Sequence, residues 1–347
     1  MIMQEIQTTP GHAGRRVIWS VTPDQTRSPY ISDIERGLRE AGWTVDKLSL
    51  RDLASTTGQI VHIQWPEHVS RSTTPAKTAA KHVRAVGLLA AIKLRRHHVV
   101  VTAHNVAPHG ESDPFDEWFR AQILRLAEIM IVLVPDHERE LRRLGQIHPE
   151  LRVVTSRQPI VPEAPAEDES AASDRESLLI LGRIHPYHRI LEFVDALIAL
   201  GSTRPVEIVG SVGDGALVEA LHQRATQHDW LTVSPGYISD EDIVPLIART
   251  SAVVSLQRTP FNSGAPFFAL ARERPVILTT GAQAKLLAEE VGSDWVFEVP
   301  EDEQSLDIDA LDAWLNAPRP TPTLDRYTVD AVACEHGELY ELLLRER

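Results

Sequence analysis

Residues 177–197 have the sequence SLLILGRIHPYHRILEFVDAL, and their pattern indicates the fold class of the chain. The apolar run SLLIL (177–181) leads into a glycine and a basic segment, and apolar residues at helical spacing follow. An apolar run joined by a short turn to an amphipathic helix is the βα unit of parallel sheets. The stretch therefore predicts an α/β domain whose first βα turn carries positive charge.

The same alternation of apolar runs and amphipathic segments continues on both sides of this stretch. Downstream, the predicted strands are 205–210, 230–234, 251–256, 275–280 and 295–299. Upstream, they are 17–21, 44–48, 60–65, 98–103, 129–134 and 151–155. The clearest helix between them has Ser28 as N-cap, Pro29 as its first residue and Gly42 as its stop signal. We expect two doubly wound, Rossmann-like sheets.

Two Pro-rich passages divide the 347-residue chain, which is long enough for two domains. The first has no periodicity and is predicted to be a linker, and the second precedes a last amphipathic helix. We expect an N-terminal domain over 1–158, a linker over 159–176, a second domain over 177–320 and a C-terminal helix within 321–347. That helix either packs on its own domain or crosses back to the first.

The composition excludes several classes of protein. The net charge of −14 at pH 7 argues against a nucleic-acid partner, and no apolar run approaches the length of a membrane span. The amino-terminal residues do not form a secretory signal, and Cys334 is the only cysteine, which excludes an internal disulfide and a thiolate metal cluster. We expect a cytoplasmic protein.

The charge is distributed unevenly along the chain. Residues 1–158 contain 21 Lys and Arg against 17 Asp and Glu, whereas residues 159–347 contain 14 against 32. Either the first half meets an anionic acceptor or membrane surface, or the acidic half simply aids solubility.

Polar loops follow the strands of the first half, where ligands of parallel sheets bind. Two histidines and a carboxylate at such strand ends are candidates for acid/base chemistry or for binding sugar hydroxyls, although single strand-end histidines are often structural. The candidates on this side are Trp65, Glu67, His104, Asn105 and His109.

The loops of the second half favour an anionic ligand. Arg183, His188 and Arg189 place positive charge before a helix, and Gly213 lies in a glycine-bearing turn before the next one. Asn262, Ser263 and Gly264 open a further helix, whose backbone N–H groups are suited to a diphosphate. A solvated basic loop and plain helix caps explain the same residues without a ligand.

The βα turn after the first predicted strand of the chain, TPDQTRS (22–28), contains no glycine. Dinucleotide-binding oxidoreductases have a glycine-rich sequence at this turn, so that class of enzyme is disfavoured.

Four segments in order resemble motifs of one enzyme class: IVHIQWPE (60–67), VVVTAHNVAPH (99–109), LLILGRIHPYHRILEFVDAL (178–197) and FNSGAPFFALARERPVI (261–277). The chain resembles GT-B glycosyltransferases of the large retaining, family 4-like class, nearest in motif style to bacterial exopolysaccharide enzymes. The resemblance implies two Rossmann-like domains facing across a cleft. It also implies that a hexosyl group is moved from a nucleoside diphosphate sugar to a saccharide or lipid-linked acceptor, with no metal and no further cofactor.

The resemblance also assigns roles to residues. Arg183 becomes the diphosphate ligand, with Asn262, Ser263 and Gly264 as further phosphate contacts. His104 lies near the transferred sugar as the catalytic candidate of the acceptor side.

The sequence departs from the family at two places. His188 occupies the position of the usual lysine, so Arg189 or another group has to share its role. The usual paired glutamates align with Pro260 and Phe268, which leaves the nucleotide and the stereochemical outcome open. A non-catalytic GT-B relative that binds a nucleotide sugar or a partner enzyme, and a sugar-nucleotide epimerase, remain as alternatives.

Two basic helix faces, one with Lys77, Lys81 and Arg84 and one with Arg139, Arg142 and Arg143, suit peripheral contact with an anionic bilayer. Solvated helix faces explain them equally.

Overall fold

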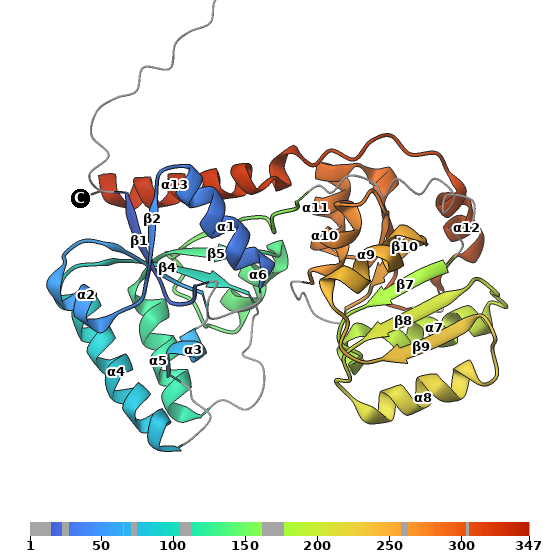
Figure 1. Ribbon diagram of the computed structural model, residues 1–347, viewed down its shortest axis with the longest axis horizontal. Coiled ribbons are helices and arrows are strands. Elements are labelled where there is room, and N and C mark those ends of the chain that lie inside the picture. Colours follow the sequence, from blue (N-terminus) through green and yellow to red (C-terminus); the bar gives the residue numbers. More distant parts are fainter. Residues whose placement is uncertain are drawn as a thin grey trace, which may run out of the picture.

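The computed structural model describes residues 15–22, 28–64, 66–70, 75–104, 113–161, 177–257, 263–302 and 305–346. Figure 1 shows two α/β domains beside one another, with the C-terminal helix lying along the first domain.

A six-stranded sheet forms the centre of the first domain. Its strands are β1 (Arg16–Trp19), β2 (Thr44–Lys47), β3 (Ile60–Ile63), β4 (His98–Ala103), β5 (Ala127–Val132) and β6 (Arg152–Thr155). They pair in parallel in the order β2-β1-β3-β4-β5-β6. Their carboxyl ends therefore meet at one edge of the sheet, where the predicted polar loops begin.

The second domain has a sheet of the same size. Its strands are β7 (Ser177–Leu181), β8 (Val206–Gly210), β9 (Leu231–Pro235), β10 (Thr250–Ser255), β11 (Val276–Thr279) and β12 (Val296–Val299). They also pair in parallel, in the order β12-β11-β10-β7-β8-β9. The strand order reverses between β7 and β10, which is where open α/β sheets bind their ligands. The prediction of two doubly wound sheets is confirmed.

Helices cover both faces of each sheet (Figure 1). Those of the first domain are α1 (Pro29–Glu40), α2 (Leu50–Ser55), α3 (Pro66–Ser70), α4 (Pro75–Leu94), α5 (Pro114–Leu126) and α6 (Pro135–Arg143). Those of the second are η3 (Pro186–His188), α7 (Ile190–Ala199), α8 (Gly215–Ala225), α9 (Asp240–Ala248), α10 (Ala265–Leu270), α11 (Ala282–Val291), η4 (Ser293–Trp295) and α12 (Ile308–Asn316). η6 (Asp325–Tyr327) and α13 (Val329–Arg345) end the chain. No helix among the described residues is both long and apolar enough to cross a bilayer.

The C-terminal helix α13 packs on the first domain, on the sheet face that α1 also covers. Val332 and Tyr340 are fully buried there with residues of β1 and β5. Gly37 of α1 allows the close approach, because a Cβ atom at this position would lie 2.6 Å from the Cβ of Ala333. The last helix thus completes the core of a sheet that begins some 300 residues earlier in the chain.

An ion-pair network joins the two domains where the chain passes between them. Arg157, which follows β6, contacts Glu290 of α11 at 2.5 Å and Glu335 of α13 at 2.8 Å. The hydroxyl of Tyr327 donates to Glu290 at 2.7 Å, and Arg326 contacts the same carboxylate. Burial acts to raise the pKa of Glu290, but the hydrogen bonds from Arg157 and Tyr327 hold it below its usual range. These contacts connect both crossing segments to α11.

Candidate active site

The strand-order reversal of the second sheet brings two predicted phosphate-binding segments together. Arg183 follows β7 and is exposed, while Ser263 and Gly264 precede α10, which follows the neighbouring strand β10. The Oγ of Ser255, at the end of β10, donates to the Oγ of Ser263 at 3.3 Å. Exposed positive charge and the start of a helix therefore lie at the same edge of the sheet, as a diphosphate requires.

Glycines let the loops after β7 and β8 lie in contact. A Cβ atom at Gly213 would lie 2.7 Å from Arg183 Nε and 2.9 Å from the carbonyl oxygen of Ile184. Gly210, at φ 154°, passes so close to the carbonyl of Gly182 that no side chain fits. Gly213 therefore leaves room for the side chain of Arg183. That Gly213 itself contacts the donor stays a prediction.

The two other basic residues of this loop differ from Arg183. Burial, with smaller contributions from the neighbouring His185 and Arg183, lowers the pKa of His188 to about 4. At neutral pH His188 is therefore uncharged and offers a hydrogen bond in place of the usual lysine charge. Arg189 is 4% exposed in a left-handed conformation (φ 54°), and it donates to the carbonyl of Glu301.

A pocket of about 750 Å³ separates the two domains at these strand ends. The second domain contributes the ends of β10 and β11, including Ser255 and Ser263, and the first domain contributes the start of α6. Two cations that sequence analysis did not select as donor ligands line it: Arg139 of α6 and Lys285 of α11. A space of this size is typical of small-molecule sites.

His104 lies at the end of β4, the strand beside β5, and is 7% exposed. Its Nε2 donates to the Oε1 of Gln64 at 3.0 Å, because an amide oxygen can only accept. The ring of Tyr30 meets the imidazole edge-on, with centroids 5.1 Å apart. Gln64 follows β3, so the two strand-end motifs of the first domain touch each other through these side chains.

A buried polar network continues behind His104 and includes the C-terminal helix. His62 contacts Thr102 Oγ1 through Nε2 at 2.7 Å, and the same Nε2 accepts from the side-chain amide N–H of Gln64 at 3.4 Å. Its Nδ1 therefore carries the proton and donates to the hydroxyl of Tyr340 at 2.6 Å. His336 donates from Nδ1 to the carbonyl of Val332, so its Nε2 accepts from Tyr30 at 3.3 Å. These hydrogen bonds fix one neutral tautomer for each of the two histidines.

Burial keeps this network uncharged. It lowers the pKa of His62 well below the usual range, with a smaller contribution from His336 and His104, and it lowers the pKa of His336 to about 4. The same desolvation raises the pKa of Tyr30 and of Tyr340.

The network predicts loss of stability in acid. Below pH 6.5 the unfolded chain takes up a proton at His336 that the folded protein excludes until about pH 4, so stability falls as pH falls through this window. From pH 7 to pH 5 this histidine alone costs about 2 kcal/mol. In His336→Gln, urea unfolding at the two pH values should show a difference smaller by that amount. An unchanged difference would refute the assignment.

Several predicted residues cannot be placed at the site. Trp65, Asn105, His109 and Asn262 lie outside the described residues, as does the side chain of Glu67 in α3. Of the predicted donor residues, Arg183, His188, Gly213, Ser263 and Gly264 lie at the carboxyl edge of the second sheet.

The predicted basic face of α6 is largely neutralised by its own helix. Arg139 pairs with Asp136, Arg142 with Glu138 and Arg143 with Glu140. On α4, Arg84 donates to the carbonyl of Leu48, and the side chain of Lys77 is outside the described part.

Known proteins resemble this chain in sequence and in fold. No family model matches the chain. The GDP-mannose:glycolipid 4-beta-D-mannosyltransferase of Xanthomonas campestris pv. campestris is 25% identical over 330 residues, covering 92% of this chain and 89% of that protein. HepE of Anabaena, solved with UDP and glucose, has a TM-score of 0.60 at 14% identity over 96% of this chain and 98% of its own. For the sucrose-phosphate synthase of Thermosynechococcus elongatus, the TM-score is 0.67 at 17% identity, covering 96% and 99%.

The solved structures show the fold, and the mannosyltransferase adds a likeness in sequence along nearly the whole chain. Together they confirm what the four motifs predict: the chain resembles the GT-B glycosyltransferases and has their two-domain architecture.

Proposed function

We propose that this glycosyltransferase holds the diphosphate of a nucleotide sugar at the carboxyl edge of the second sheet and transfers a hexosyl group to an acceptor hydroxyl held by the first domain. The observation that carries the proposal is the pocket of about 750 Å³ that lies between the ends of β10 and β11 and the start of α6. Arg183 follows β7, the strand beside β10, at the same edge of this sheet. Because its relative in sequence is named for GDP-mannose and a glycolipid, we propose GDP-mannose and a lipid-linked saccharide as the first substrates to test.

Neutralisation of the leaving diphosphate is the main task of the second domain. We assign it to Arg183, to the backbone N–H groups from Gly264 onward and to Lys285, which lines the pocket. Fixed cations and helix N–H groups stabilise such charge without a metal. We therefore propose a reaction that needs neither a metal in the cleft nor a cofactor.

His104 is proposed as the catalytic residue of the first domain. Its bond to Gln64 fixes which ring nitrogen carries the proton and holds the ring at the strand end. Sequence analysis missed Gln64 as a site residue, although it directly follows a predicted strand. An imidazole positioned in this way can exchange a proton or hydrogen-bond a sugar hydroxyl near neutral pH.

The missing glutamates favour the alternative of a non-catalytic binding protein. Phe268 of α10 stands where the second carboxylate is usual, and its ring packs against Arg272. A transfer assay separates the two hypotheses: GDP-mannose and a polyprenyl-diphosphate-linked saccharide should yield GDP and a mannosylated lipid in equal amounts. Conversion of the donor without acceptor would support an epimerase, and absence of turnover with every bound nucleotide sugar would support the non-catalytic relative.

Peripheral contact with the inner face of the cell membrane, in exopolysaccharide synthesis, is proposed from the surface of α4. Val83, Val86 and Leu94 are 75%, 47% and 81% exposed on one helix face, and Lys93 and Arg95 are exposed beside them. Exposed apolar side chains next to cations are typical of helices that lie on anionic bilayers.

The membrane proposal predicts that the protein cosediments with vesicles of anionic phosphatidylglycerol. Val83→Asp combined with Val86→Asp should weaken this binding at least tenfold, because it removes apolar area and adds negative charge. Leu200→Asp, at a 39% exposed position of the second domain, is the matched control. Equal sedimentation of the double variant and the control would contradict the proposal.

A further inference from the structure

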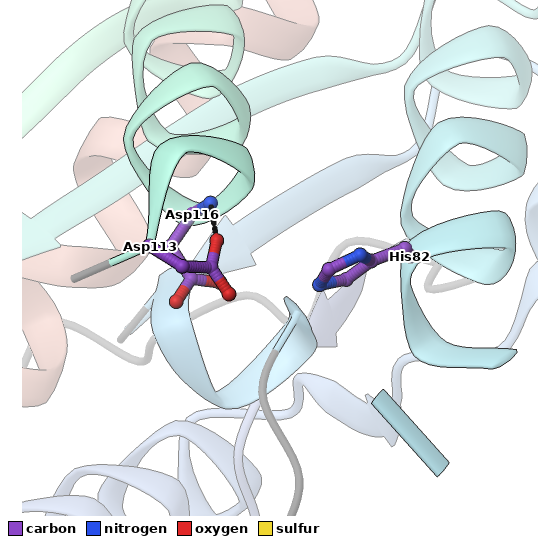
Figure 2. A group of neighbouring side chains, drawn as sticks. All are labelled: His82, Asp113 and Asp116. Carbon is purple, nitrogen blue, oxygen red and sulfur yellow. Dashed lines mark hydrogen bonds between the residues drawn. The ribbon is translucent and has the colours of Figure 1, made fainter. Parts of the chain in front are cut away.

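Three side chains with metal-ligating atoms gather between α4 and α5, apart from the residues assigned to the cleft. They are His82 of α4, Asp113 at the N-cap of α5 and Asp116 in its first turn. Their ligating atoms all lie within 4.8 Å of one another. Figure 2 shows the imidazole of His82 reaching from one helix toward the two carboxylates at the start of the other.

Neighbouring groups hold each of the three side chains in place. Asp113 accepts from the backbone N–H of Asp116 at 2.9 Å, and Ser70 of α3 donates to Asp116 at 2.5 Å. The imidazole of His82 stacks on the ring of Phe115, with centroids 3.7 Å apart and an angle of 14°. Ligands fixed by an outer layer of contacts are the rule at metal sites, because such contacts set ring and carboxylate orientation.

The Nε2 atom of His82 provides an independent indication that a ligand binds at this position. It is inaccessible to solvent and has no hydrogen-bond partner among the described residues. A buried polar atom without a partner destabilises the folded protein, and here it accompanies a carboxylate, Asp116, that is only 5% exposed. A cation would bind the imidazole and offset the repulsion between the two carboxylates.

We propose that His82, Asp113 and Asp116 bind a divalent transition metal of the Zn²⁺ type. Imidazole nitrogens and carboxylate oxygens are both ligands of Zn²⁺, and a fourth position remains for water. Tetrahedral coordination at about 2.1 Å places ligand atoms about 3.4 Å apart, so the side chains have to close slightly around the ion. The imidazole selects against Mg²⁺, which prefers oxygen ligands.

The ion would stabilise the acceptor-side half of the molecule. Its ligands join α4 to the start of α5, and Ser70 connects the site to α3. We assign it no step in sugar transfer. No local sequence pattern marks this site, since thirty or more residues separate His82 from the aspartates and the ligands come together only when the helices pack.

The test is titration of the metal-free, EDTA-treated full chain with ZnCl₂ by calorimetry, together with thermal unfolding. The wild type should bind one Zn²⁺ and gain several degrees in Tm, whereas MgCl₂ should have no effect. His82→Ala and Asp113→Asn should each weaken Zn²⁺ binding at least tenfold. Asparagine is an equally good N-cap, so Asp113→Asn keeps the fold even if His82→Ala disturbs packing. His148→Ala, at an exposed histidine of the same domain, is the control.

Loss of binding in both site variants but not in His148→Ala supports the site. Wild-type affinity in either site variant, absence of stoichiometric Zn²⁺ binding to the wild type, or equal stabilisation by Mg²⁺ overturns it. These readouts do not depend on transferase activity.

Discussion

His104→Ala is expected to abolish most sugar transfer while leaving the donor bound. A positioned acid/base group contributes about 10²–10⁴-fold to a rate, and we expect kcat to fall within that range. The diphosphate ligands lie in the other domain, so the calorimetric Kd for the donor nucleotide should stay within about twofold. Transfer kinetics and calorimetry on the same preparations measure the two effects separately.

Controls distinguish this effect from simple damage to the fold. His104 is buried, so truncation leaves a cavity. His104→Gln fills most of that space and keeps a donor for Gln64, and it should fold normally yet remain inactive. A Gln64→Leu variant should reduce kcat and shift its pH profile, because the tautomer of His104 is no longer fixed. Full activity in His104→Gln would remove His104 from the mechanism.

Arg183→Ala is expected to weaken binding of the nucleoside diphosphate about 100-fold. Hydrogen bonds to a charged phosphate are roughly twice as strong as neutral ones, and loss of one partner of a charge pair commonly costs 2 kcal/mol or more. Arg183 is exposed at a loop whose backbone does not depend on the guanidinium, so the melting temperature should hardly change. Calorimetry with the preferred nucleotide measures the loss.

The matched control is Arg249→Ala. Arg249 precedes β10 at the opposite edge of the same sheet and pairs on the surface with Glu207. Arg249 carries the same charge as Arg183 but lies away from the proposed donor site, so Arg249→Ala should bind the donor nucleotide as tightly as the wild type does. If both variants lose affinity equally, the effect is one of overall charge and the site assignment fails.

Much of the fold can be predicted from the sequence because buried parallel strands appear as short apolar runs. The run at 60–65 illustrates the limit: β3 ends at Ile63, since the backbone N–H of Gln64 donates to the Oγ of Ser20 instead of continuing the sheet. β5 begins at Ala127, two residues before its predicted start, beside a register shift against β4.

The site is less predictable because it depends on where side chains point. The sequence places Arg183 and Arg189 in one basic segment. Arg189 itself has a left-handed backbone conformation at the helix start, and its side chain points inward and donates to the carbonyl of Glu301. Helical spacing likewise groups the arginines of α6 on one face but does not reveal their ion pairs with the same helix.

Long-range packing explains why the sequence does not reveal several other residues of the pocket and of the buried network. Tyr30 and His336 are 306 residues apart, and only the packing of α13 on α1 brings them together. Lys285 and Arg139 come from different domains and share a pocket only in the folded molecule. No local pattern assigns any of the four to the pocket or to the buried polar network.

The central claim is that the second domain binds the nucleoside diphosphate of a sugar donor in the cleft. Calorimetry and thermal unfolding of the purified protein with UDP, GDP, ADP and their common sugar conjugates test it most directly. We predict selective, one-to-one binding of a single nucleoside diphosphate, with GDP as the first candidate, and loss of that binding in Arg183→Ala. No response to any of these nucleotides, or equal binding by Arg183→Ala, would contradict the account.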